Sequence, residues 1–139
     1  MGPNLLTVVV AWLAGPVLVG SAVHATEPMI TTQNLLKDPK FKSAYLSALG
    51  PKAKEKWLST MTNSAPVSKV TLVGESFQIA TPCKPHDCAE HNLLLLYAPA
   101  KGVVYGKLYE KGTTTLIGAP SAAISADLEK MWKKEFRQQ

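Results

Sequence analysis

Residues 91–117 read HNLLLLYAPAKGVVYGKLYEKGTTTLI and contain three apolar runs separated by short polar links. The runs and links are, in chain order, residues 91–97, Lys101-Gly102, residues 103–109, Lys111-Gly112 and residues 113–117. Short apolar runs rich in β-branched and aromatic residues and bounded by glycine predict strands. Because the links are too short for a crossover connection, we expect consecutive strands to pair antiparallel.

A hairpin is predicted immediately before these strands. Two segments alternate in side-chain character around a turn signal at Gly74-Glu75, as strands with one buried face do. The alternating positions are Val70, Leu72, Phe77, Ile79 and Thr81. Together with the three later runs, the hairpin predicts five strands joined by short links, which is an antiparallel meander.

Helical patterns flank the strand region on both sides. Asp38-Pro39 is typical of a helix start, Gly50-Pro51 of a helix end, and Pro120-Ser121 opens the last helix. Three apolar stripes follow helical spacing: Phe41, Tyr45 and Leu49; then Ala53, Trp57, Leu58 and Met61; and finally Ile124, Leu128, Met131, Trp132 and Phe136. Such stripes are typical of a core, not of a ligand site. Helices that bracket a sheet predict an α+β domain.

The N-terminal segment has the pattern of an export signal. Leu5–Val19 is almost entirely apolar, and small residues follow it up to Ala25. We predict a signal peptide over residues 1–25, cleaved after Ala25. A retained membrane anchor is the alternative, but Gly15-Pro16 would disturb a spanning helix. Residues 26–139 then form a single domain with one modest core.

The charge balance is basic, with 15 Lys and Arg against 10 Asp and Glu, a formal net charge of +5. A basic domain raises nucleic acid as a partner. The lysines, however, are scattered singly, without a basic stripe interleaved with aromatic residues. We therefore interpret the charges as a solvated surface and expect no nucleic-acid partner.

The segment Cys83-Lys84-Pro85-His86-Asp87-Cys88 contains both cysteines of the chain. A disulfide requires an oxidising compartment, which export would provide. If the two thiols are oxidised, the segment is a stiff protrusion that presents an imidazole and a carboxylate. Such a protrusion suits insertion into the cleft of another protein.

Other interpretations of this segment remain open from the residues alone. Zinc could be bound by Cys83, His86, Cys88 and His91, but the spacing departs from familiar zinc sites. A redox or haem pair would require C-x-x-C, which is absent. Acid-base catalysis by His86 and Asp87 would need a converging nucleophile or second carboxylate, and no such motif is visible. A structural staple with an incidental histidine is the interpretation that composition alone favours, and no cofactor or metal is expected.

The run CKPHDC, between a hairpin and an apolar strand of an exported basic domain, resembles the signature loop of the inhibitor of vertebrate lysozyme (Ivy) family. The resemblance extends to Gly102-x-x-Tyr105-Gly106 and to Leu116-Ile117-Gly118-x-Pro120. It implies a three-layer α/β/α sandwich around a five-stranded antiparallel meander sheet. It also implies a periplasmic protein that inhibits c-type lysozyme and is not itself an enzyme.

The resemblance further implies that the loop enters the active-site cleft of the enzyme. His86 is then the key residue, because in that family the loop histidine meets the catalytic carboxyl pair. The resemblance assigns the disulfide to Cys83 and Cys88. It assigns shaping of the loop or contact with the enzyme to Lys84, Pro85 and Asp87.

Two functions of other classes compete with inhibition. One is an envelope structural or binding domain of unknown ligand with a disulfide-stapled loop, and the other is an enzyme acting on peptidoglycan. An endogenous lytic enzyme as a second target, and a homodimer, stay open. After removal of the leader, no membrane partner is expected.

Overall fold

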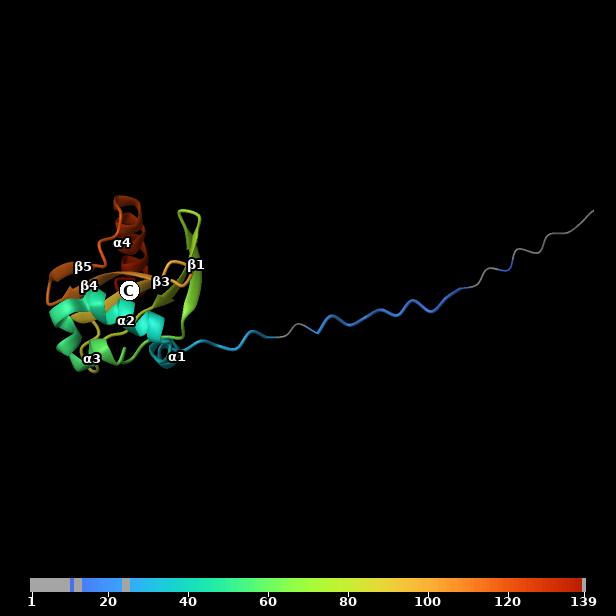
Figure 1. Cartoon of the computed structure of the whole chain (residues 1–139), viewed down its shortest axis with the longest axis horizontal. Helices are drawn as coiled ribbons and strands as arrows, with labels where there is room; N and C mark the ends of the chain where they lie inside the picture. The colour runs from blue at the N-terminus through green and yellow to red at the C-terminus, as the bar shows by residue number, and fades with distance from the viewer. Residues whose placement is uncertain (1–10, 12–13, 24–25, 139) are drawn as a thin grey trace, which may run out of the picture.

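The computed structural model describes residue 11 and residues 14–23 and 26–138. The elements are, in chain order, α1 (Thr32–Lys37), α2 (Pro39–Leu49), the 3-10 helix η1 (Gly50–Lys54), α3 (Lys56–Ser59), β1 (Ser68–Leu72), β2 (Glu75–Ala80), β3 (His91–Ala98), β4 (Val103–Glu110), β5 (Thr113–Ile117) and α4 (Ala122–Phe136). Figure 1 shows the strands between α4 and the N-terminal group of helices.

The five strands form one antiparallel sheet in the order β1-β2-β3-β4-β5, so the predicted meander is confirmed. The first turn, however, lies one residue earlier than predicted. Val73 and Gly74 are its central residues, with φ of 51° and 73°, and Leu72 pairs directly with Glu75. Two left-handed residues between paired strand ends match the twist of a hairpin, which explains why Glu75 belongs to the strand.

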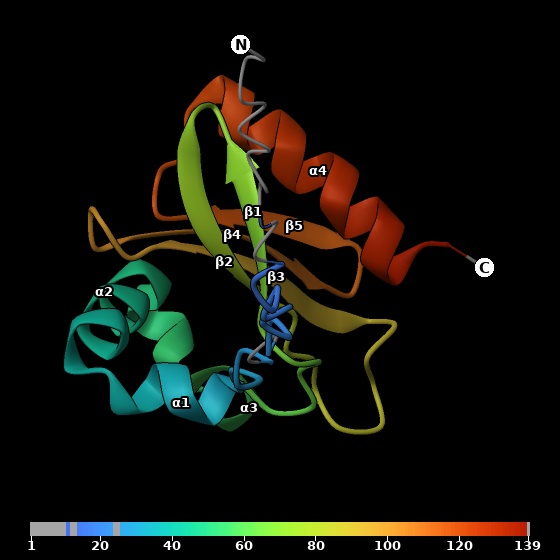
Figure 2. The same ribbon diagram turned by 90° about the vertical axis from the view of Figure 1, so that its right-hand side faces the viewer.

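Strand β3 is buried along its whole length and supplies both faces of the sheet. Leu93, Leu95 and Tyr97 belong to a core cluster with α1, α2 and α3. The alternate residues, such as Leu94 and Leu96, belong to a second cluster with α4. Figure 2 shows these helices on opposite sides of the strands. The predicted α+β class is therefore confirmed, and the continuous apolar run HNLLLLYA is explained by burial on both faces.

Helix α2 forms as predicted. The Asp38 side chain accepts a hydrogen bond from the Lys40 backbone N–H at 2.9 Å, and Pro39 occupies the first turn. Gly50 ends the helix with φ of 55°. The stripe of Phe41, Tyr45 and Leu49 is buried, as an amphipathic helix against a sheet requires.

The second predicted helix, with the stripe Ala53 to Met61, is wrong as a continuous element. The chain forms η1 and then α3, because Glu55 between them has extended backbone angles. The Glu55 carboxylate accepts a hydrogen bond from Trp57 Nε1 at 2.9 Å. The helix α1 was not predicted, although Thr31 and Asn34 form a capping box that marks its start.

Helix α4 agrees with the prediction from its first residue to its last turn. The Ser121 side chain accepts a hydrogen bond from the Ile124 backbone N–H at 3.2 Å. Ile124, Leu128 and Trp132 are buried against the sheet. Met131 and Phe136 are partly buried and pack on the same cluster.

The predicted leader, residues 1–25, lies largely outside the described residues, as does the predicted cleavage site after Ala25. Its described part, residue 11 and residues 14–23, contains no helix or strand. Within the part of the chain that the structure describes, every helix is too short or too polar to span a lipid bilayer.

Candidate functional site

The segment that contains both cysteines connects β2 to β3 and protrudes from one end of the sheet, at the lower right of Figure 2. Cys83 is 5% exposed and pairs with Asn92 in an isolated β-bridge. Lys84, Pro85 and His86 are exposed. The base of the loop is therefore part of the sheet, and its tip faces solvent.

Cys83 and Cys88 form a disulfide with a Cα–Cα distance of 4.9 Å. The disulfide that the resemblance implied is thus present. The zinc interpretation requires both thiolates as ligands, and both sulfurs are already bonded to each other. Among the described residues, no group of three or more His, Cys, Asp or Glu side chains is placed to hold a metal ion.

His86 lies at the tip of a tight turn. The Asp87 backbone N–H donates to the Lys84 carbonyl at 3.0 Å, which closes a four-residue turn with Pro85 second. His86 is third and has φ of 64°. Proline second and a left-handed residue third are features of a type II turn, in which the third residue is usually glycine or asparagine. A histidine there is held in a conformation that L residues rarely adopt.

The Asp87 carboxylate forms a hydrogen bond with His91 and none with the side chain of its neighbour His86. The carboxylate lies 2.7 Å from Nδ1 of His91, the first residue of β3. His91 is only 8% exposed, and its ring meets Trp57 edge to face, with centroids 6.5 Å apart. The His91 backbone N–H also donates to the Asp87 carbonyl at 2.9 Å. Of the two predicted roles of Asp87, these contacts favour shaping of the loop.

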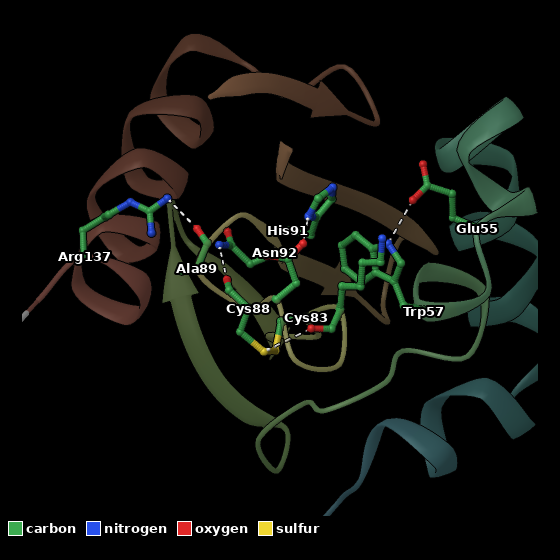
Figure 3. A network of polar contacts seen from close by, with 10 residues as sticks. Glu55, Trp57, Cys83, Cys88, Ala89, His91, Asn92 and Arg137 are labelled. Carbon is green, nitrogen blue, oxygen red and sulfur yellow. Dashed lines mark hydrogen bonds and ion pairs between the residues drawn. A yellow bond between two sulfur atoms is a disulfide. The ribbon is translucent and has the colours of Figure 1, made fainter. Parts of the chain in front are cut away.

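The sequence did not indicate which side chains support the second half of the loop. Asn92 Nδ2 donates to the Cys88 carbonyl at 2.8 Å, and Arg137 Nη2 donates to the Ala89 carbonyl at 3.1 Å (Figure 3). Asn92 is the second residue of β3, and Arg137 lies 48 residues after Ala89 in the sequence. Only the i,i+4 spacing of Cys88 and Asn92 was visible as a local signal.

A mainly apolar hollow lies beside the loop. It is lined by Glu55, Lys56, Trp57, Thr62, Lys84 and Pro85. Because Lys84 and Pro85 form one wall, the exposed tip and the hollow belong to one continuous surface.

The fold and the site define a small α+β protein with an exposed, disulfide-closed loop at one end of its sheet. A family model described as "Inhibitor of vertebrate lysozyme (Ivy)" matches residues 40–138. This chain therefore belongs to the Ivy family, as the resemblance suggested.

Curated relatives carry the same family name. An inhibitor of vertebrate lysozyme from Pseudomonas aeruginosa is 30% identical over 95 residues, which cover 64% of this chain and 62% of that protein. The protein of this name from Escherichia coli K12 is 26% identical over 92 residues, which cover 63% of this chain and 59% of that protein. The chain thus spans less than two thirds of the length of these relatives.

Proposed function

We propose that this protein inhibits a c-type lysozyme by inserting the Cys83–Cys88 loop, with His86 at its tip, into the active-site cleft. The observation that carries the proposal is an exposed histidine at the tip of a disulfide-closed turn in a chain of the Ivy family. The names of the relatives, which describe inhibition of vertebrate lysozyme, support the same target.

The chemistry of the target supports a histidine at the tip. A retaining glycosidase holds two carboxyl groups about 5 Å apart, one protonated as the general acid and one ionised. A neutral imidazole has one nitrogen that donates and one that accepts a hydrogen bond. The His86 ring can therefore accept from the protonated group and donate to the ionised one. It offers no glycosidic bond to cleave, so the complex is a dead end for catalysis.

The loop geometry supports a rigid insertion. Binding must suppress any freedom that the free loop has, and fixing the backbone of one residue costs about 1–2 kcal/mol. Three restraints remove that freedom before binding: the disulfide, Pro85, and the Asp87–His91 contact at 2.7 Å. Because Asp87 is held by His91, its carboxylate is turned toward the domain and away from the carboxylates of a target enzyme.

The setting proposed for this activity is the periplasm. The segment 1–25 would act as the export signal, and residues 26–139 would act as the mature single domain. Lysozyme reaches peptidoglycan through the periplasm. The oxidising conditions of the periplasm also keep a disulfide formed. The protein would act by occupying the cleft, without a catalytic step, metal or cofactor of its own.

A turbidity assay tests the proposal. Purified residues 26–139 are added to a c-type lysozyme and bacterial cell walls, and the rate of clearing is measured at several substrate concentrations. We expect clearing to slow in proportion to inhibitor, with a pattern competitive with the cell wall. No effect on lysozyme would favour an envelope binding domain, and clearing by the protein alone would identify a peptidoglycan enzyme.

Removal of the disulfide should weaken the affinity for lysozyme while leaving the domain folded. In the Cys83→Ser/Cys88→Ser variant the cross-link is lost from a short loop, which lowers the unfolding free energy by about 2 kcal/mol. Both core clusters are built mainly from residues outside the loop, so the domain should remain folded. Freeing even one loop residue costs about 1–2 kcal/mol on binding, which is roughly a tenfold loss of affinity.

The measurements for the disulfide variant are circular dichroism and the inhibition constant, compared with the oxidised parent protein. Alkylation of the parent without reduction should label no cysteine. A variant that melts much earlier but inhibits as well as the parent while folded would show that the bridge is only a structural staple.

A further inference from the structure

We propose that Arg137, at the end of α4, is a positioning residue that holds the returning arm of the loop, Cys88–Glu90, in its binding conformation. This inference rests on the proposed function, because it assigns the loop's order to a residue outside the loop. Arg137 would act through Ala89, on the opposite side of the disulfide from the arm that enters from β2.

The two arms of the loop are held in different ways. The entering arm is fixed by backbone hydrogen bonds: Cys83 donates to the Thr62 carbonyl, and Leu93 donates to the Pro82 carbonyl, both at 3.0 Å. Cys83 also forms the β-bridge with Asn92. The returning arm has no such bridge among the described residues. Its Glu90 carbonyl accepts a hydrogen bond from the Lys111 backbone N–H at 2.8 Å, whereas its Cys88 and Ala89 carbonyls accept hydrogen bonds from side chains.

The first of these side-chain contacts starts on α4. Trp132 Nε1 donates to Asn92 Oδ1 at 2.6 Å, and Asn92 Nδ2 donates to the Cys88 carbonyl at 2.8 Å. Asn92 is fully buried, so each end of its amide has a partner that it needs. The indole is itself held: Lys107 Nζ lies 3.9 Å from its ring centroid and pairs with the Glu129 carboxylate. This hydrogen bond from Lys107 lowers the pKa of Glu129.

The second contact is made by Arg137 itself. Its guanidinium carbon lies 4.5 Å from the ring centroid of Tyr109 and 4.6 Å from that of Trp132. Nη2 donates to the Ala89 carbonyl at 3.1 Å (Figure 3). The backbone N–H of Arg137 ends α4 by donating to the Lys133 carbonyl at 3.0 Å. A planar guanidinium stacked on aromatic rings and aimed at a carbonyl is a geometry that lysine cannot reproduce.

The C-terminal end of α4 therefore supports the returning arm from outside the loop. The disulfide joins the two arms at Cys83 and Cys88, but Ala89 lies beyond it. Without the Arg137 contact, Ala89 can leave its native conformation while the disulfide and the hydrogen bond from Lys111 to Glu90 remain in place. The population of the binding-competent loop then falls, and the apparent affinity for the target falls by the same factor.

The test compares Arg137→Gln with Lys134→Gln. Each variant removes one positive charge from the C-terminal end of α4, and both side chains are exposed, so both variants should fold. We expect Arg137→Gln to weaken binding to a c-type lysozyme by about fivefold, as loss of one hydrogen bond from an exposed side chain implies. Lys134→Gln should stay within about twofold of the parent protein. Arg137→Lys should recover only part of the loss, because it restores the charge but not the stacking.

The second readout is the order of the free loop, which requires no lysozyme. The backbone N–H groups of Glu90 and His91 donate to the Asp87 carbonyl at 3.2 and 2.9 Å. Their hydrogen exchange should be about fivefold faster in Arg137→Gln and unchanged in Lys134→Gln, whereas core amides of β3 should not change.

The outcomes separate the inference from the proposed function. Weaker binding with unchanged loop exchange would mean that Arg137 contacts the enzyme directly, and the positioning role would be wrong. Unchanged binding, with or without faster exchange, would also overturn it. If the parent protein inhibits no lysozyme, the proposed function fails, and loop exchange alone decides whether Arg137 orders the returning arm.

Discussion

His86→Ala should weaken lysozyme inhibition by about thirtyfold, and His86→Asp should weaken it further. A central interface side chain that loses its contacts commonly costs about 2 kcal/mol or more, which corresponds to this factor. Alanine leaves a space that water can refill. Aspartate instead brings a fixed negative charge against the enzyme's own carboxylate in a cleft from which water has been displaced.

The left-handed conformation of His86 decides which control is needed. Its φ of 64° is tolerated better by Asn and Asp than by Ala. Any extra weakening in His86→Asp therefore does not come from backbone strain. His86→Asn is the matched control, since it shares the size and backbone tolerance of Asp without the charge. We expect the order of affinities to be His, then Asn and Ala, then Asp.

The inhibition constants of the four proteins, measured with one lysozyme, check this order. The Asn and Asp variants should keep the parent's thermal midpoint, because residue 86 is exposed at the tip of the loop, and the Ala variant should melt slightly earlier, because alanine tolerates the φ of 64° less well. Equal losses for Asn and Asp would mean that the loop blocks the cleft by shape alone. An alanine variant within about threefold of the parent, or ~0.7 kcal/mol, would remove His86 from the site.

Gly118→Ala should have the largest effect on stability, lowering the unfolding free energy by about 3 kcal/mol or more, because backbone strain and a steric clash add at this position. Gly118 follows β5 with φ of 80°, a conformation that costs an L residue about 1–2 kcal/mol. A Cβ at this position would also lie only 1.8 Å from the Val104 carbonyl oxygen. This oxygen belongs to the backbone of β4, so the clash can be relieved only by moving a strand of the sheet.

Gly74→Ala is the control for the conformational part of this effect. Gly74 has φ of 73°, but a Cβ added there would have no neighbouring atom within 4 Å. The Gly74→Ala variant should therefore lose only about 1–2 kcal/mol. Urea unfolding of the parent and both variants measures the difference. Equal losses at the two glycines would mean that β4 and the end of β5 separate at little cost.

The elements that were predicted correctly depend on signals that act over a few residues. The alternation on either side of Gly74 predicted the first two strands, and the two Lys-Gly links between apolar runs predicted the other three. Asp38 and Ser121 predicted the starts of α2 and α4, and in each case the side chain caps its own helix. These interactions involve neighbours in the sequence, so they can be recognised without the rest of the fold.

The prediction of one continuous helix from the second apolar stripe was wrong, and the reason lies in the tertiary structure. The spacing of the stripe indicates a helix, and Trp57, Leu58 and Met61 are buried as such a stripe requires. These side chains pack against one face of the sheet, and the helical conformation is interrupted at Glu55, which is extended between η1 and α3. Packing against a sheet overrides a weak helical preference in so short a segment.

The candidate loop was recognised from its six residues, whereas the contacts that order it were not. The closure between two nearby cysteines, the exposed proline and histidine, and the strands on either side could be predicted, because each depends on near neighbours. That Asp87 binds His91 and that Arg137 reaches Ala89 became visible only in the folded chain. The Asp87–His91 contact spans only four residues but depends on the turn that joins the loop to β3. The Arg137 contact depends on how β3, β4 and α4 pack together, because residues distant in the sequence come into contact only through that packing.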